Sequence, residues 1–140
     1  MANTQQVSGV MKQVALAAVV DSKTLKAALY LASATTNGTN TVYTSTGEVT
    51  GTNYTAGGVS VTNANAAGLT STTAYWTPSA SIAFTTVTLA TAFDAVMIYS
   101  TTDSNRNLGV FTFGSQTITA GTFTLTMPTN DSSTGLIRFA

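Results

Sequence analysis

Hydrophobic and polar residues alternate along most of the 140-residue chain, a pattern that predicts β-strands. Residues 24–33 (TLKAALYLAS) place four apolar side chains on one face of a strand that we expect to be buried mainly on that side: Leu25, Ala27, Leu29 and Leu31. Short strands are also predicted near residues 42–43 and 59–61. Two or three more are expected between residues 71 and 100, with Pro78 at an edge or a turn.

The last third of the chain has the most regular alternation. LGVFTFGS, QTITAGTFTLTMP and GLIRFA are each predicted to contain strands, and DSNRN, GSQ, TAG and TNDSST lie between them as turns. Turns at this spacing are typical of a sandwich or a barrel. We therefore predict an all-β fold, a β-sandwich or jelly-roll-like barrel of about seven to nine antiparallel strands, as a single domain over residues 21–140.

Residues 1–20 have a different period and predict a short N-terminal helix or arm. Apolar side chains recur at helical spacing from a cap at Asn3 or Thr4 to about Val19, in spite of Gly9. This stripe needs a cover, either from the chain's own sandwich or from a neighbouring molecule, and we favour the neighbour. The candidate interface residues on the stripe are Val7, Val10, Met11 and Val14.

The longest apolar run of this segment, VALAAVV at 14–20, is much shorter than the roughly 20 residues that cross a bilayer. Asp21, Lys23 and Lys26 follow it before the small residues ASA at 32–34, so we do not expect a secretory signal.

Composition narrows the range of functions. Charged residues make up 7% of the chain, against roughly 25% in typical soluble domains, and about a fifth of the residues are threonine. Five basic and five acidic residues give zero net charge, so neither nucleic acid nor a membrane is an expected partner. Cysteine and histidine are both absent, which excludes disulfides, thiolate chemistry and imidazole catalysis. We expect no catalytic residues, no cofactor and no metal site.

A glycine-rich stretch at 47–58, GEVTGTNYTAGG, raises the question of a phosphate loop. It lacks the Gly-Lys-Ser/Thr ending and runs into a predicted strand, whereas phosphate loops lead into a helix. We interpret it as a structural turn, in which Glu48 caps backbone amides or meets a cation. Gly57 and Gly58 would permit a bulge or positive φ, and Gly47 and Gly51 complete the turn set.

Three other residues are candidates for an interface. Asp94 stands in the apolar segment AFDAVMIY and either pairs with a cation on another subunit or faces water, the interpretation that we favour. Tyr75 and Trp76 are either interface anchors or core aromatics. The carboxylates have no spacing typical of a glycosidase pair, and DSNRN at 103–107 fits a hairpin turn better than a calcium loop.

A series of motifs, taken in order, resembles a family of small structural proteins of tailed bacteriophages that decorate or cement the outer surface of the capsid. The motifs are KTLKAALYLASAT, VYTSTGEVTGTNYTAGG, AVMIYS, NLGVFTFGS, TAGTFTLTMP and the terminal GLIRFA, and they cover most of residues 22–140.

The resemblance implies a virion protein that is made in the host cytoplasm and binds the major capsid protein on the outside of the phage head. It also implies self-association, for which a homotrimer is the expected state. The alternative is a β-domain associated with a tail or fibre, which would bind a host surface through exposed aromatic side chains.

Overall fold

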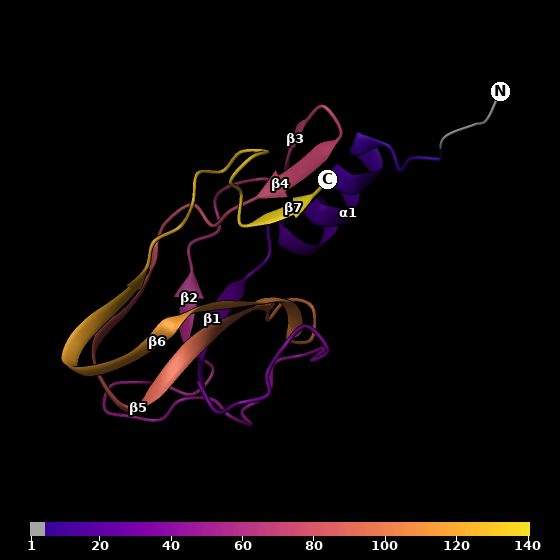
Figure 1. Ribbon diagram of the computed structural model, residues 1–140. Coiled ribbons are helices and arrows are strands. Elements are labelled where there is room, and N and C mark those ends of the chain that lie inside the picture. Colours follow the sequence, from indigo (N-terminus) through magenta and orange to yellow (C-terminus); the bar gives the residue numbers. More distant parts are fainter. Residues whose placement is uncertain (1–4) are drawn as a thin grey trace.

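The computed structural model describes residues 5–140, which form one helix and seven strands in two antiparallel sheets (Figure 1). The elements are α1 (Gly9–Val20), β1 (Leu25–Leu31), β2 (Val59–Val61), β3 (Gly68–Thr70), β4 (Thr73–Trp76), β5 (Ile82–Ser100), β6 (Arg106–Leu125) and β7 (Ile137–Phe139). This arrangement confirms the predicted all-β, sandwich-like fold with a short N-terminal helix.

The larger sheet has the strand order β2-β1-β5-β6. Its strand β1 pairs with β2 on one side and with β5 on the other, so β1 lies inside the sheet. The prediction that this strand is buried mainly on one side is wrong, because Ala28 and Tyr30 are as buried as Leu25 and Leu29. Ala28 and Tyr30 belong to a second apolar cluster with Met97 and Tyr99 on the opposite face.

Strands β5 and β6 form one long antiparallel hairpin, joined at the predicted DSNRN turn. Ser104 and Asn105 both have positive φ, as a type I′ hairpin turn requires. We expected several shorter strands, divided by GSQ and TAG. Instead, register shifts absorb the irregular positions within both strands, because bulges let paired strands bend without ending.

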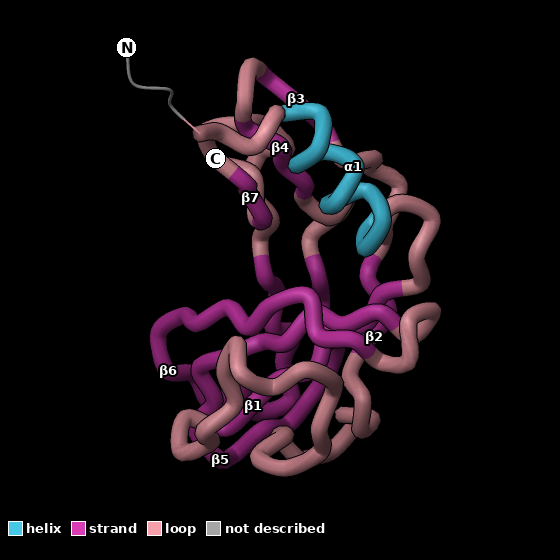
Figure 2. The backbone as a smooth tube through the Cα atoms, turned by 90° about the vertical axis from the view of Figure 1, so that its right-hand side faces the viewer, coloured by secondary structure: helices cyan, strands magenta, loops and turns pink. Residues whose placement is uncertain are grey.

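The smaller sheet, β3-β4-β7, lies beside α1 at one end of the molecule, and the larger sheet forms the other end (Figure 2). Leu16 and Val20 of α1 are completely buried and join the core that also contains Trp76. The same core continues through Phe84 and Phe93 into the larger sheet. The helix is therefore packed on the chain's own β-structure, and is not a detached arm.

Helix α1 begins later than predicted, because Ser8 is its N-cap and accepts a hydrogen bond from the Met11 amide at 3.2 Å. The expected caps, Asn3 and Thr4, lie outside the described residues. Gly9 has a clear role, since a Cβ there would lie 2.7 Å from the Ser71 carbonyl oxygen. The missing side chain lets the first turn of the helix approach the β3–β4 turn closely.

Candidate binding surfaces

The glycine-rich stretch 47–58 ends a 27-residue connection, 32–58, that links β1 to β2 without a strand of its own. Gly47, Gly57 and Gly58 have φ values of 79°, 87° and 72°, a region that favours glycine. Gly58 also passes so close to the backbone of Ala27 that a side chain would collide with it. These positions agree with the interpretation as a structural turn.

Glu48 is the centre of this connection and is only 7% exposed. Its Oε1 accepts hydrogen bonds from the Tyr54 hydroxyl at 2.7 Å and from the Gly57 amide at 2.8 Å, and its Oε2 accepts one from the Tyr43 hydroxyl at 2.6 Å. The carboxylate thus ties two parts of the loop to its C-terminal turn. The sequence left open whether Glu48 caps backbone amides or meets a cation; the bond from the Gly57 amide agrees with the first, and the two tyrosines were not predicted.

Two more tyrosines surround this centre and fix the loop to the larger sheet. The Tyr30 hydroxyl donates to the Thr44 carbonyl at 2.6 Å, and the Tyr99 hydroxyl donates to the Gly57 carbonyl at 2.8 Å. Tyr99 also stacks on Tyr43, with ring centroids 4.7 Å apart. We call Glu48 and Tyr30, Tyr43, Tyr54 and Tyr99 the Glu48 cluster.

Burial, reinforced by the negative charge of Glu48, raises the pKa of Tyr30 to about 12. Burial also raises the pKa of Tyr43, Tyr54 and Tyr99 above the ordinary tyrosine value, with a further rise from the hydrogen bond to Glu48 at Tyr43 and Tyr54 and from the charge of Glu48 at Tyr99. The four phenols therefore keep their protons and act as hydrogen-bond donors at neutral pH. With every hydroxyl engaged in the fold, the cluster has the character of a structural network.

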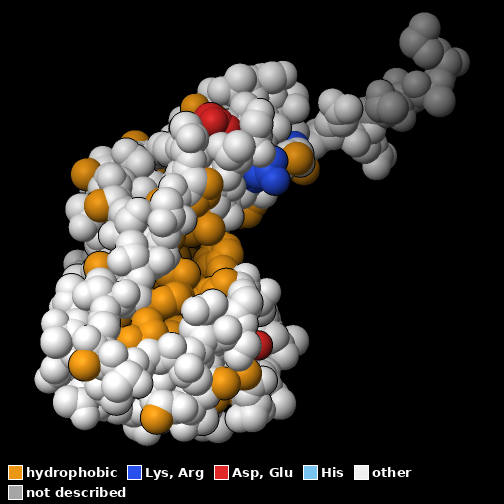
Figure 3. Space-filling view, turned by 60° about the vertical axis from the view of Figure 1, so that its left-hand side comes forward, with side chains coloured by type: hydrophobic (Ala, Val, Ile, Leu, Met, Phe, Trp, Pro, Cys, Tyr) orange, Lys and Arg blue, Asp and Glu red, His pale blue; other side chains and the backbone are white. Residues whose placement is uncertain are grey.

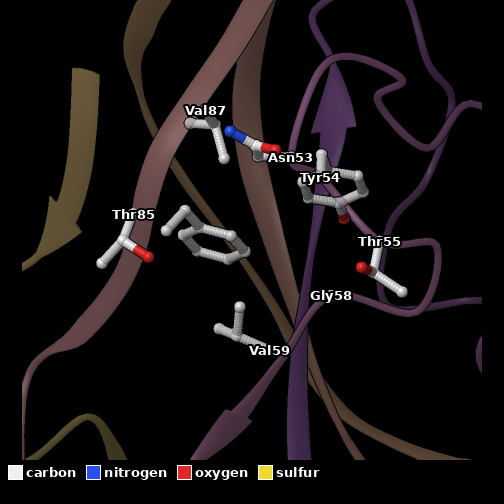
Figure 4. Close-up of a pocket in the computed structure, with 8 residues that line it drawn as sticks. Asn53, Tyr54, Thr55, Gly58, Val59, Thr85 and Val87 are labelled. Atoms are coloured by element: carbon white, nitrogen blue, oxygen red, sulfur yellow. The ribbon is translucent and has the colours of Figure 1, made fainter. Parts of the chain in front are cut away.

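A small pocket of about 90 Å³ adjoins the loop, and residues that line it are shown in Figure 4. Tyr54 stacks on Phe84 beside it, with ring centroids 6.0 Å apart. An apolar cavity of ~150 Å³ holds a benzene molecule, so this pocket is too small for a ring of that size. The Tyr54 hydroxyl, moreover, is already bonded to Glu48 and to the Leu29 amide.

Three of the candidate interface residues of the N-terminal segment, Val10, Met11 and Val14, lie on the solvent side of α1, and the fourth, Val7, lies just before the helix. Their exposed fractions are 57% for Val7, 62% for Val10, 64% for Met11 and 63% for Val14. We call these four residues the apolar ridge. They are four of the six large hydrophobic side chains that are exposed in residues 5–140, and the other two are Val42 and Phe139.

The ridge stays exposed because the opposite face of α1 is held by the smaller sheet. Besides the burial of Leu16 and Val20, the Gln13 amide donates to the Ala67 carbonyl at 2.9 Å, and the Lys12 ammonium donates to the Thr72 carbonyl at 3.2 Å. The helix cannot turn the ridge inward without breaking these contacts. The chain therefore covers one face of the helix itself, and the ridge on the other face stays exposed. Whether a neighbouring molecule covers the ridge, as we favoured, stays a prediction.

A second apolar surface lies between β6 and the segment that leads into β7. It encloses about 130 Å³, and we call it the apolar groove. Figure 3 shows hydrophobic side chains along the hollow between the helix-bearing end of the molecule and the larger sheet. The groove is lined by Ile82, Val96, Ile98, Phe111, Thr112, Phe113, Leu125, Thr126, Met127, Pro128 and Leu136.

The structure makes the other candidate interface residues less accessible to a partner than the ridge. Trp76 is completely buried, and its indole N–H donates to Asn63 and to the Asn65 carbonyl, so Trp76 is a core residue and is unable to anchor a partner. Tyr75 is partly buried, and its ring fills the space above Gly68 on the paired strand. Asp94 is partly exposed at a register shift of β5 and forms no salt bridge within residues 5–140.

Two other acidic residues, Asp103 and Asp131, support turns. Asp103 forms a salt bridge with Lys23 at 3.0 Å, and this hydrogen bond is the main cause that lowers the pKa of Asp103. Asp131 accepts hydrogen bonds from the amides of Ser133 and Thr134, which lower its pKa. Within residues 5–140, no group of three or more acidic, cysteine or histidine side chains lies together as a metal site would require. No helix in that range is both long and apolar enough to cross a membrane.

Comparison with family models, with curated proteins and with solved structures finds no match to this chain.

Proposed function

We propose that this protein is a structural component of a phage virion, which binds the outside of the capsid and stabilises or decorates it. The observation that carries the proposal is the apolar ridge, where Val10, Met11 and Val14 are each more than 60% exposed. Isolated exposed hydrophobic residues are ordinary, but a contiguous apolar patch on a fixed helix marks a surface that another molecule covers. The motif series at residues 22–140 supplies the virion context.

The interior of the molecule supports an architectural role over a catalytic one. Glu48 and its tyrosines are engaged with one another and with backbone groups, so the cluster offers no free acid or base to a substrate. A decoration protein needs a rigid body and a repeated contact, because many equivalent sites on one lattice convert modest contacts into high avidity. Self-association, with a homotrimer as the expected state, is part of this proposal.

The alternative, a tail or fibre domain that binds host glycans, depends on exposed aromatic rings. Among the tyrosine, tryptophan and phenylalanine side chains of residues 5–140, only Phe139 is exposed, at 39%. The large exposed side chains of the ridge are aliphatic, and aliphatic surfaces suit protein partners better than sugars. The scarcity of exposed aromatic rings therefore favours a capsid protein over a host glycan as the partner.

Binding to capsids tests the proposal directly. Purified protein is mixed with phage heads that lack it, the heads are sedimented, and antibody labelling in the electron microscope locates the protein on complete virions. We expect saturable binding to heads and label over the capsid. Label confined to the tail or the fibres would support the alternative, and label on neither structure would refute a virion role.

A further inference from the structure

Asn37 and Gly38 form the only Asn-Gly pair of the chain, and they lie in the long connection between β1 and β2. Neither residue has a positive φ. Both are exposed, and a Cβ added at Gly38 would meet nothing within 4 Å. Glycine at this position is therefore required neither by the backbone conformation nor by close packing, and the pair is open to solvent.

The hydrogen bonds of this turn hold the Asn37 side chain beside the Gly38 amide. Asn37 Oδ1 accepts a hydrogen bond from the Thr39 amide at 2.8 Å, which closes an Asx turn around the peptide bond between Asn37 and Gly38. Asn37 Nδ2 donates to the Thr35 carbonyl at 3.0 Å, and the Asn37 amide donates to Asn40 Oδ1 at 2.9 Å. The Gly38 amide donates no hydrogen bond within residues 5–140, so its nitrogen is the free one of the turn.

From this geometry we propose that Asn37 is a site of spontaneous deamidation in the folded protein. The Gly38 nitrogen loses its proton to a base in the solvent and attacks Cγ of Asn37, and the new bond closes a succinimide ring. The bond between Cγ and Nδ2 breaks, and Nδ2 takes up a proton and leaves as ammonia.

Water then opens the succinimide. Its hydroxyl adds to one of the ring carbonyl carbons, the bond from that carbon to the Gly38 nitrogen breaks, and the nitrogen regains a proton. Opening at Cγ produces aspartate, and opening at the main-chain carbonyl of Asn37 produces isoaspartate. The overall reaction consumes one water and releases one ammonia, and no group is oxidised or reduced.

The turn favours the first step in three ways. Glycine has no side chain to shield its nitrogen, whereas every other asparagine of the chain precedes a residue with a side chain. The Asx turn holds the attacking nitrogen and Cγ within one closed ring, so their ordering is already achieved. The Thr39 amide stabilises the negative charge that develops on Oδ1 during the attack, as a donor in an oxyanion hole does.

The modification changes the charge of the protein and, in one product, its main chain. Deamidation adds a negative charge to a chain whose net charge is zero. Aspartate keeps a side-chain oxygen for the Thr39 amide, so this product leaves the turn closed. Isoaspartate adds a methylene group to the main chain and breaks the turn. The reaction needs no partner and is therefore independent of the proposed function.

Ageing of the purified full chain in water labelled with heavy oxygen tests the site. Each deamidation leaves one labelled oxygen in the new carboxylate, peptide mass mapping locates it, and an isoaspartyl methyltransferase assay measures isoaspartate. We expect residue 37 to be labelled at least ~10-fold faster than any other asparagine, which corresponds to a barrier lower by ~1.4 kcal/mol. The rate should rise from neutral to mildly alkaline pH, because the Gly38 nitrogen must lose its proton.

Two glycine substitutions separate the chemistry from the fold. Gly38→Ala places a methyl group in open space, so the protein should stay folded by circular dichroism while labelling of residue 37 falls at least ~10-fold. Gly114→Ala is the matched control, because Gly114 is also exposed, has no positive φ and precedes no reacting group. It should leave the labelling rate at residue 37 unchanged. Equal rates in the Gly38→Ala variant and the unmodified protein would overturn the proposal.

The same chain unfolded in urea shows whether the native turn permits the reaction. We expect residue 37 to be labelled in the native protein at least as fast as in the unfolded chain, because the turn presents the free nitrogen to Cγ. Labelling in urea but not in the native protein would mean that the hydrogen bonds of the turn block the attack, and would refute the proposal. No capsid is present, so neither result affects the capsid-binding experiment.

Discussion

At the scale of single residues, the Glu48 cluster explains how a connection of 27 residues keeps one conformation without forming a strand. Connections of that length are uncommon in compact domains unless something holds them. Here one carboxylate accepts three hydrogen bonds, and Tyr30 and Tyr99 fasten the same loop to β1 and β5. A single buried anion thus replaces the backbone ladder that a strand would have provided.

We predict that Glu48→Gln lowers the free energy of unfolding by about 1–3 kcal/mol, the usual penalty for unsatisfied buried polar groups. The new amide nitrogen would face hydroxyl or amide donors at a position where a carboxylate oxygen now accepts. Urea denaturation followed by fluorescence measures the change. Asp94→Asn is the matched control, because Asp94 forms no salt bridge within the described residues, and its change should stay within ~0.5 kcal/mol. Equal effects of the two substitutions would contradict this account.

The sequence predicted the chemistry of Glu48 in part, since the glycines around it indicated a turn and the carboxylate indicated a cap. Its tyrosine partners were beyond prediction, because their meeting depends on the path of the whole connection and on the register between β1 and β5. Four of the five tyrosines gather here, a concentration that no periodicity in the sequence signals.

At the scale of elements, helix α1 has two apolar faces. Its helical spacing was sufficient to predict a helix and to single out Val7, Val10, Met11 and Val14. It was insufficient to choose the face that packs, because Leu16 and Val20, one turn apart, form a second apolar stripe. The smaller sheet covers that second stripe, with Gly9 allowing the close approach. The stripe that the sequence singled out is the one that stays exposed.

The two faces should respond differently to the same kind of truncation. We expect Leu16→Ala to lower the free energy of unfolding by about 2–5 kcal/mol, because it removes a completely buried side chain and leaves a cavity. Val14→Ala should change it by less than ~0.5 kcal/mol, since its side chain is mostly exposed and alanine favours the helix. Thermal unfolding at a concentration where the protein is monomeric gives both values. A large loss from Val14→Ala alone would place the ridge in the intrachain core.

At the scale of the whole molecule, the long β5–β6 hairpin makes up most of the larger sheet and shares one apolar core with α1 and the smaller sheet. The alternation of residues 82–125 predicted strands in this region, and the DSNRN turn was predicted in its place. The predicted total of about seven to nine strands includes the seven observed, but the continuity of β6 across GSQ and TAG was not predicted, because both have the composition of turns. The continuous pairing with β5 holds them within the sheet, where Ala120 takes a positive φ of 47° at an irregular position. Long-range pairing thus overrides local turn signals.

The distribution of charge over the whole molecule determines how assembly should respond to salt. The net charge is zero, the ten charged residues are scattered, and neither the ridge nor the groove lining contains one of them. Long-range attraction between molecules is therefore weak, and there is little for added salt to screen. Contact between apolar surfaces, in contrast, is maintained or strengthened at high salt.

We predict that self-association and capsid binding change less than about threefold between 50 mM and 500 mM sodium chloride, over which the Debye length falls from roughly 14 Å to 4 Å. Sedimentation at each salt concentration measures both equilibria on the same protein. As an internal control, a variant with Asp94→Lys, which shifts the net charge by two units, should show the same weak dependence if Asp94 lies outside the contact. A steep fall in binding of the unmodified protein with rising salt would mean that ion pairs, and not the apolar ridge, hold the assembly together.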